Sequence, residues 1–131
     1  MVCLDTSFII ALIRRHEAAE EKLEEYTSAG ERLTTTPIAA CELFKGAYRS
    51  NRREDELGKV RGMLGFLELL EFSAEACERY GKLMSDVSLR SRQLGDMDAI
   101  IASIALTSNE KLVTANMKHF ERVPGLLLDS W

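Results

Sequence analysis

The sequence has few of the residues that build disulfide frameworks or zinc sites. Its 131 residues include three cysteines, Cys3, Cys41 and Cys77, and two histidines. The cysteines are far apart in the chain and form no Cys-x-x-Cys pair or Cys/His cluster, which argues against both kinds of site. Each cysteine lies among apolar residues, so we expect buried, reduced thiols of the kind found in cytoplasmic proteins.

Long apolar runs are missing as well. No stretch approaches the roughly 20 apolar residues that a membrane-spanning helix needs, and no basic region followed by such a stretch suggests a signal peptide. Basic charge is not in excess, because the net charge is −4. That balance argues against a protein that coats nucleic acid, but not against a nuclease, whose acidic metal ligands lower the formal charge.

The length and composition fit one globular domain, residues 1–131, with 46% hydrophobic residues. Short apolar segments predict strands at residues 2–5, 32–36, 67–72, 111–115 and 126–129. Longer periodic segments predict helices at about residues 7–12, 16–29, 37–48, 57–66, 73–87 and 96–106, with residues 49–56 as a turn or helix end. The alternation predicts an α/β fold with a mostly parallel central sheet of about five strands flanked by helices.

Several residues are suited to the ends of these helices. Thr6 or Ser7 can cap the first helix, and Gly30 is a plausible end for the second. Asp96 and Asp98 compete for the cap of the last helix, and Asp96 is the better candidate for this structural role.

Four carboxylates lie directly beside apolar stretches at widely separated points of the chain. Asp5 closes the first strand, Glu42 interrupts an apolar helix, and Asp96 and Asp98 precede the run Ala-Ile-Ile-Ala. Carboxylates are rarely buried without a partner, because removing a charge from water costs free energy. A hard divalent cation held by oxygen ligands would neutralise them together.

The predicted topology brings these acids towards one crevice. In open α/β sheets, ligands bind beyond the carboxyl ends of the strands. Asp5 is at such an end, Glu42 and Asp98 lie early in helices, and Asn116 directly follows the fourth strand. Mg²⁺ or Mn²⁺ suits this oxygen site. One ion could generate a nucleophile from bound water, and a second could stabilise the leaving oxygen of a phosphoryl displacement.

Each of these residues also has a structural interpretation. Asp5 suits a cap or a turn, Asn116 a turn, and Glu42 could pair with Lys45 or Arg49 on its own helix. The two cations on that face suit an RNA phosphate backbone, or simply a solvated basic face.

Other catalytic sites fit the sequence less well. His16 and His119 lie beside charged residues, and neither is expected to be catalytic. A serine hydrolase is a weak interpretation, because it would need a base near Ser7 or Thr6 and the sequence shows none there. A domain that uses an aspartyl phosphate would need a lysine after a late strand, whereas Lys111 precedes its strand.

Four sequence blocks in order carry a likeness to a known family. They are Leu-Asp-Thr-Ser from Leu4, Thr-Pro-Ile-Ala-Ala-Cys-Glu-Leu from Thr36, Gly-Asp-Met-Asp-Ala-Ile-Ile-Ala from Gly95, and Leu-Val-Thr-Ala-Asn from Leu112 with the following His-Phe pair. The chain resembles the PIN-domain family, and within it the VapC-type toxins of prokaryotic toxin–antitoxin pairs. The resemblance spans nearly the whole chain.

The resemblance implies an endoribonuclease that depends on Mg²⁺ or Mn²⁺. Asp5, Glu42 and Asp98 match the family's metal-binding, catalytic acids, and Asp98 is chosen over Asp96 because it directly precedes the Ala-Ile-Ile-Ala run. A fourth position, often aspartate in the family, is Asn116 here, which puts a tight second metal site in doubt. Thr6 and Thr114 match positions that support the site through hydroxyl hydrogen bonds, while Asp96 is assigned a helix-cap or supporting role.

The resemblance also implies partners: an RNA substrate, a cognate antitoxin that reaches into the acidic site, and a second copy of the chain in a homodimer. Candidate contacts are Phe8, Leu12, Ile13, Phe44 and Tyr48, although core burial explains them equally well. Two alternatives stay open. One is an interaction module with a degenerate metal site, which Asn116 favours slightly; the other is an RNA-processing nuclease outside a toxin–antitoxin pair.

Overall fold

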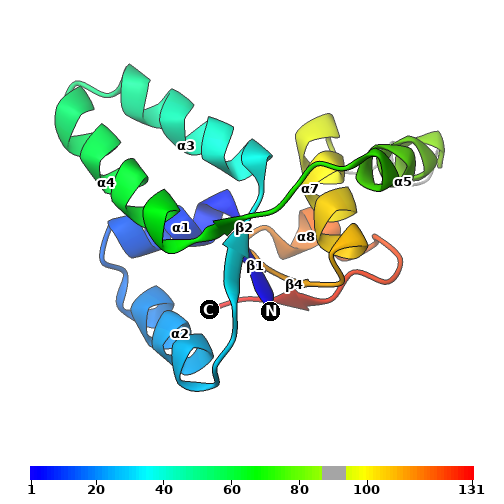
Figure 1. Ribbon diagram of the computed structural model, residues 1–131, viewed down its shortest axis with the longest axis horizontal. Coiled ribbons are helices and arrows are strands. Elements are labelled where there is room, and N and C mark those ends of the chain that lie inside the picture. The colour runs from blue at the N-terminus through cyan, green and yellow to red at the C-terminus, as the bar shows by residue number, and fades with distance from the viewer. Residues whose placement is uncertain (87–93) are drawn as a thin grey trace.

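Five short parallel strands form the centre of the computed structural model, which describes residues 1–86 and 94–131 (Figure 1). The strands run in the order β3-β2-β1-β4-β5, and all four pairings are parallel. Their bounds are β1 (Val2–Leu4), β2 (Leu33–Thr35), β3 (Glu68–Leu69), β4 (Lys111–Val113) and β5 (Leu128–Asp129). The predicted five-strand parallel sheet is confirmed.

Helices cover both faces of this sheet. The helices are α1 (Thr6–Ile13), α2 (Glu17–Ser28), α3 (Pro37–Arg49), α4 (Arg53–Phe66), α5 (Ala74–Ser85), α7 (Asp96–Thr107) and α8 (Met117–Phe120). Val2 and Leu4 pack into a core shared with α1–α4, whereas Cys3 packs into a second core with α5, α7 and α8. Successive strand residues point to opposite faces, so the three residues of β1 contribute to both cores.

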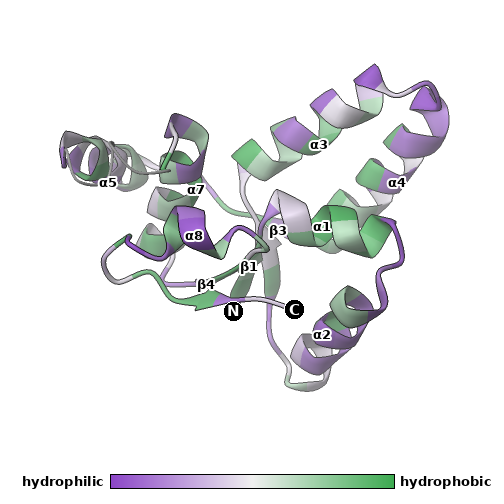
Figure 2. Ribbon diagram, turned by 180° about the vertical axis from the view of Figure 1, so that it is seen from behind, coloured by the Kyte–Doolittle hydropathy of each residue, from purple (hydrophilic) through white to green (hydrophobic). Residues whose placement is uncertain are grey.

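The helices differ in how much of their surface is apolar. Figure 2 shows α1 as mostly hydrophobic and α2 as mostly hydrophilic. Helix α2 buries only Ala19 and Tyr26, and the Tyr26 hydroxyl donates to Asp129 of β5. Trp131 packs edge-on against Phe8 of α1, with ring centroids 4.8 Å apart. These contacts attach the last strand to the first two helices.

In the described part of the chain, no helix combines the length and apolar character that a transmembrane segment would require.

Element boundaries differ from the sequence prediction most clearly at four elements. Helix α4 begins at Arg53, where a turn was predicted, because three acidic residues in its first turn suit the positive end of the helix dipole. The strands predicted at residues 67–72 and 126–129 shrink to two residues each. They are the edge strands of the sheet, each with a neighbour on one side only. The helix predicted to reach Val87 ends at Ser85, and Val87 itself lies outside the described residues.

The helix caps are also partly wrong in the prediction. Asp5, not Thr6 or Ser7, holds the N-cap position of α1. Gly95, not Asp96 or Asp98, holds that of α7, and both acids lie inside the first turn. Gly30 is confirmed as the residue that ends α2, because it adopts a φ of 74°, which favours glycine.

Burial corrects the prediction for the thiols and for the candidate contact surface. Cys3 is buried, but Cys41 and Cys77 are exposed, since both lie on the outer faces of amphipathic helices. Phe8 and Leu12 belong to the core, whereas Tyr48 is 52% exposed. Phe8 and Leu12 are therefore excluded as contacts with a partner. Ile13 and Phe44, which are half-buried, and the exposed Tyr48 remain candidates.

Candidate active site

Acids from three separate elements gather at the carboxyl edge of the sheet. Asp5 directly follows β1, Glu42 lies in the second turn of α3, and Asp98 lies in the first turn of α7. Strands β2, β1 and β4 are neighbours and parallel, so the segments that leave them start at the same edge. The structure thus places the predicted acids where the sequence suggested.

Asp5 is the most enclosed of the three acids, with 5% of its surface exposed. Burial raises the pKa of its carboxyl, hydrogen bonds from Thr114 and from the backbone of Thr6 lower it, and the charges of Glu42 and Asp98 raise it; the net pKa is raised. The Thr114 hydroxyl donates to Oδ2 of Asp5 at 2.7 Å. The three carboxylates therefore interact electrostatically around a single buried group.

Glu42 is held by the residue that follows Asp5. The Thr6 hydroxyl donates to Oε1 of Glu42 at 2.9 Å, which links the start of α1 to α3. The alternative partners suggested by the sequence, Lys45 and Arg49, are exposed and make no ion pair with Glu42 within residues 1–86. The interpretation of Glu42 as half of a helical ion pair is therefore wrong.

Asp98 has a partner that the sequence did not reveal. Oδ2 of Asp98 lies 2.9 Å from Nδ1 of His119, a residue of the short helix α8. Neither α8 nor this contact was predicted, because four residues carry too little periodicity and the pair is separated by 21 positions. The sequence feature that could have pointed to His119 is its place in the fourth block, directly before Phe120. The structure shows that Phe120 is buried.

Ser7 is a second residue that the sequence prediction missed. Its hydroxyl accepts a hydrogen bond from the backbone N–H of Ala115 at 3.0 Å and lies 3.5 Å from the Thr114 hydroxyl. The backbone N–H of Asn116 donates to the same Thr114 hydroxyl at 3.0 Å. The segment that follows β4 is thus fastened to the start of α1, beside Asp5.

Two residues predicted to support the site use their side chains elsewhere or leave them exposed. Asp96 accepts a hydrogen bond from the Tyr80 hydroxyl of α5 at 2.8 Å, which makes it a link between α5 and α7. Asn116 is exposed at the N-cap position of α8, and its side chain caps no backbone N–H there. Neither side chain contacts the three acids through a hydrogen bond in the described residues.

The three acids fit a divalent cation by the chemistry of their donor atoms. They are oxygen donors, as Mg²⁺ and Mn²⁺ prefer. As the side chains stand, no three His, Cys, Asp or Glu groups within residues 1–86 and 94–131 are arranged to hold a metal ion. Thr6 and His119 contact Oε1 of Glu42 and Oδ2 of Asp98, which leaves each of these acids a second carboxylate oxygen for an ion.

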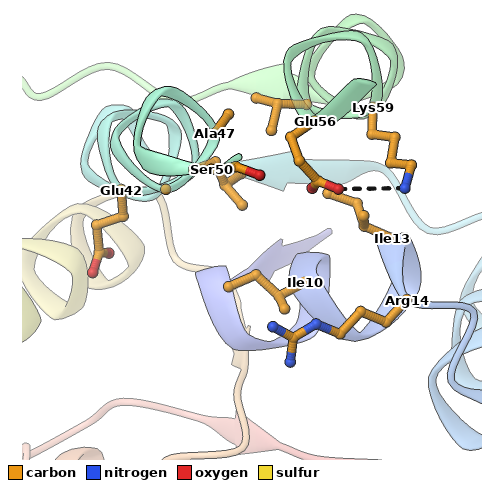
Figure 3. Close-up of a pocket in the computed structure, with 11 residues that line it drawn as sticks. Ile10, Ile13, Arg14, Glu42, Ala47, Ser50, Glu56 and Lys59 are labelled. Atoms are coloured by element: carbon orange, nitrogen blue, oxygen red, sulfur yellow. Dashed lines mark hydrogen bonds and ion pairs between the residues drawn. The ribbon is translucent and has the colours of Figure 1, made fainter. Parts of the chain in front are cut away.

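A cleft of about 420 Å³ extends from Glu42 between α1, α3 and α4 (Figure 3). Its apolar wall includes Ile10, Ile13 and Val60, and its cations are Arg14 and Lys59. Figure 3 shows Glu42 at one end and the Glu56–Lys59 ion pair at the other. Neither of the predicted phosphate contacts on α3, Lys45 and Arg49, lines this cleft.

Comparison with known proteins identifies the family. The model of the PIN domain matches residues 2–126, almost the whole chain. The chain belongs to the PIN-domain family. Its sequence is 31% identical to "Ribonuclease VapC2" of Rickettsia felis over 128 residues, which cover 98% of this chain and 96% of that protein. It is 30% identical to the "tRNA(fMet)-specific endonuclease VapC" of Salmonella typhimurium over 129 residues, with the same coverage.

Solved structures of such PIN domains confirm the fold. A crystal structure of VapBC2 from Rickettsia felis bound to a promoter DNA fragment matches with a TM-score of 0.90 and 31% identity, covering 100% of this chain and 99% of that chain. DNA-bound VapBC from Salmonella typhimurium matches with a TM-score of 0.88 and 30% identity, with the same coverage. Within this family the chain is VapC-type, as the four sequence blocks suggested.

Proposed function

We propose that this PIN domain is a divalent-metal-dependent endoribonuclease and the toxin of a toxin–antitoxin pair. The observation that carries the proposal is the buried Asp5 carboxyl, whose pKa is raised in part by Glu42 and Asp98. Three acids that interact in this way are better satisfied by a cation than by one another. The relatives named as ribonucleases and endonucleases support RNA as the substrate.

Asp5, Glu42 and Asp98 are the residues proposed to hold Mg²⁺ or Mn²⁺. Metal binding there would supply an activated water for phosphodiester hydrolysis. Thr114 and Thr6 hold two of the carboxylates in place through their hydroxyls. Asn116 offers a neutral amide at the end of the same loop, which adds no charge to the site and favours one ion over two.

Cations near the acids are proposed to hold the RNA backbone. Lys45 and Arg49 extend outward from Glu42 along α3, and both side chains are exposed. Arg14 lies in the cleft that begins at Glu42. A phosphate chain could pass from the acids towards either group, since its charge is neutralised by lysine and arginine wherever they follow its path.

An antitoxin is the proposed protein partner. The structures from Rickettsia felis and Salmonella typhimurium are of VapBC complexes. In this chain the cleft has an apolar wall and an acid at one end, which suits a peptide segment with apolar side chains and one cation. A homodimer stays a prediction, for which the exposed Tyr48 is a candidate contact.

Substitution of the acids tests the nuclease proposal. We expect Asp5→Asn and Asp98→Asn each to lower the rate of RNA cleavage by roughly 100-fold or more. Loss of a residue that merely hydrogen-bonds to a metal ligand costs about 10- to 100-fold, and loss of the ligand itself should cost at least as much. Asp5→Asn should leave the melting temperature unchanged or higher, because it removes a buried charge. The measurement is cleavage of labelled single-stranded RNA with Mg²⁺ or Mn²⁺, and with EDTA.

The chain offers a matched control in the same helical turn. Asp96 lies two positions before Asp98, but it accepts its hydrogen bond from Tyr80 of α5. Asp96→Asn should therefore retain RNA cleavage. Cleavage that survives in both Asp5→Asn and Asp98→Asn would contradict the proposal. Wild-type protein that neither cleaves RNA nor gains thermal stability with Mn²⁺ would instead support an interaction module with a degenerate site.

A further inference from the structure

One short segment of the chain contacts two of the three acids. Residues 114–119 run from the end of β4 into α8. At its start Thr114 donates to Asp5, and at its end the His119 imidazole lies against Asp98. Between them, the backbone N–H groups of Ala115 and Asn116 donate to the Ser7 and Thr114 hydroxyls. The spacing between two acids thus depends on how one segment is held.

The imidazole end of this segment is anchored from behind. Phe120, the next residue, is fully buried in the core beneath α7. Its burial fixes the backbone that carries His119, whose side chain is itself 41% exposed. An ionised carboxylate only accepts hydrogen bonds, so Nδ1 of His119 is the donor in its contact with Asp98. The other ring nitrogen, Nε2, takes no part in this contact with Asp98.

Asp98 needs such a partner more than Asp5 does. Asp5 is surrounded by protein, with 5% of its surface exposed, whereas 27% of the Asp98 side chain is exposed. Apart from the His119 contact, Asp98 is constrained by its place in the first turn of α7. A carboxylate with this freedom can take several rotamers, and a single fixed donor selects among them.

We infer that His119 is a positioning residue, which orients the Asp98 carboxylate for metal binding through its Nδ1–H. The inference rests on the proposed metal-dependent function and adds a residue to it. His119 acts through Asp98 and does not itself contact the ion. Its partner in this task is Thr114, which does the same for Asp5 from the other end of the segment.

Mn²⁺ binding to the purified full chain tests the inference without any RNA. We expect His119→Ala to weaken Mn²⁺ affinity about 10- to 100-fold, the usual loss when a hydrogen-bond partner of a metal ligand is removed. His119→Asn should retain wild-type affinity, because its amide nitrogen can occupy the place of Nδ1. The titration is followed by the electron paramagnetic resonance signal of free Mn²⁺, and melting temperatures in EDTA confirm that each variant folds.

His16→Ala is the matched control, since His16 is exposed at the start of α2 and should bind Mn²⁺ like the wild type. Wild-type affinity in His119→Ala would overturn the inference while leaving the proposed function intact. Loss of binding in His119→Asn as large as in His119→Ala would also overturn it, because the imidazole would then be a ligand itself. A wild-type chain that binds no Mn²⁺ would overturn the proposed function and the inference together.

Discussion

At the scale of single residues, the site is a set of carboxylates that each depend on one hydrogen-bond donor. Thr114 supports Asp5, Thr6 supports Glu42 and His119 supports Asp98. Hydrogen bonds to charged groups stabilise more than neutral ones, and the more so where water is excluded. The Thr114 bond should therefore contribute most to the stability of the folded chain, since Asp5 is the buried member.

A comparison of two buried threonines tests this ranking. Thr114→Val should lower the free energy of unfolding by about 1.5–3 kcal/mol, because a buried carboxylate loses its donor. Thr35→Val, which removes a hydroxyl that donates to the Leu4 carbonyl at 2.7 Å, should cost about 0.5–1.5 kcal/mol. Urea unfolding at pH 7 measures both. Equal costs for the two variants would show that the charge of Asp5 does not strengthen its bond.

At the scale of elements, α3 carries Glu42, and the residues at its N-terminus fix where this helix begins. The Thr36 hydroxyl accepts from the N–H of Ala39 at 3.1 Å, and Pro37 occupies the first helical position. Helix α5 has an equivalent cap, in which the Ser73 hydroxyl accepts from Ala76 at 3.2 Å, but it carries none of the three acids. The two caps allow the stability of a helix to be separated from its role in the site.

Removal of either cap should lower the stability of the chain, but only removal of the α3 cap should also affect metal binding. Thr36→Ala and Ser73→Ala should each lower the free energy of unfolding by about 1 kcal/mol, as cap substitutions do. Only Thr36→Ala should also weaken Mn²⁺ affinity, because Glu42 lies less than two turns beyond that cap. Chemical denaturation and Mn²⁺ titration of both variants check this. Equal Mn²⁺ affinity in the two variants would separate the cap of α3 from the site.

Elements were predictable from the sequence where a local pattern decides them. The strand before Asp5 and the helix after Pro37 follow from short apolar runs and a proline, so Asp5 and Glu42 were placed correctly. The cap of α7 was not, because Gly95 takes that position by backbone conformation and not by its side chain. The contact of His119 with Asp98 was equally hidden, since it arises only when α8 folds back onto α7.

At the scale of the whole molecule, a buried acid lies at the opposite edge of the sheet from the site. Glu110 directly precedes β4, is 3% exposed, and has one carboxyl oxygen without a partner among the described residues. Thr34 contacts its other oxygen and also donates to the Val2 carbonyl at 3.0 Å. A hydroxyl has one proton, so if that proton goes to Val2, the carboxyl must supply the proton for its own contact.

Burial raises the pKa of Glu110 from its usual 4.5, and so does the charge of Glu68 on β3. The Thr34 bond, the amino group of Met1 and the Arg32 guanidinium lower the pKa without reversing the direction. The folded chain therefore keeps this proton at pH values where the unfolded chain has released it. Because the folded state then binds more protons, stability must fall as pH rises from about 4.5 through the raised pKa.

Glu110→Gln isolates this contribution to the pH dependence. The free energy of unfolding of the wild type should decrease as the pH rises above about 4.5, and the decrease should be smaller in Glu110→Gln, which keeps a neutral side chain at every pH. Asp5, whose pKa is also raised, stays in both proteins and contributes equally to each curve. Urea unfolding across this range gives the two slopes. Equal slopes would mean that Glu110 is ionised in the folded chain, and that the Thr34 hydroxyl donates to it instead of to Val2.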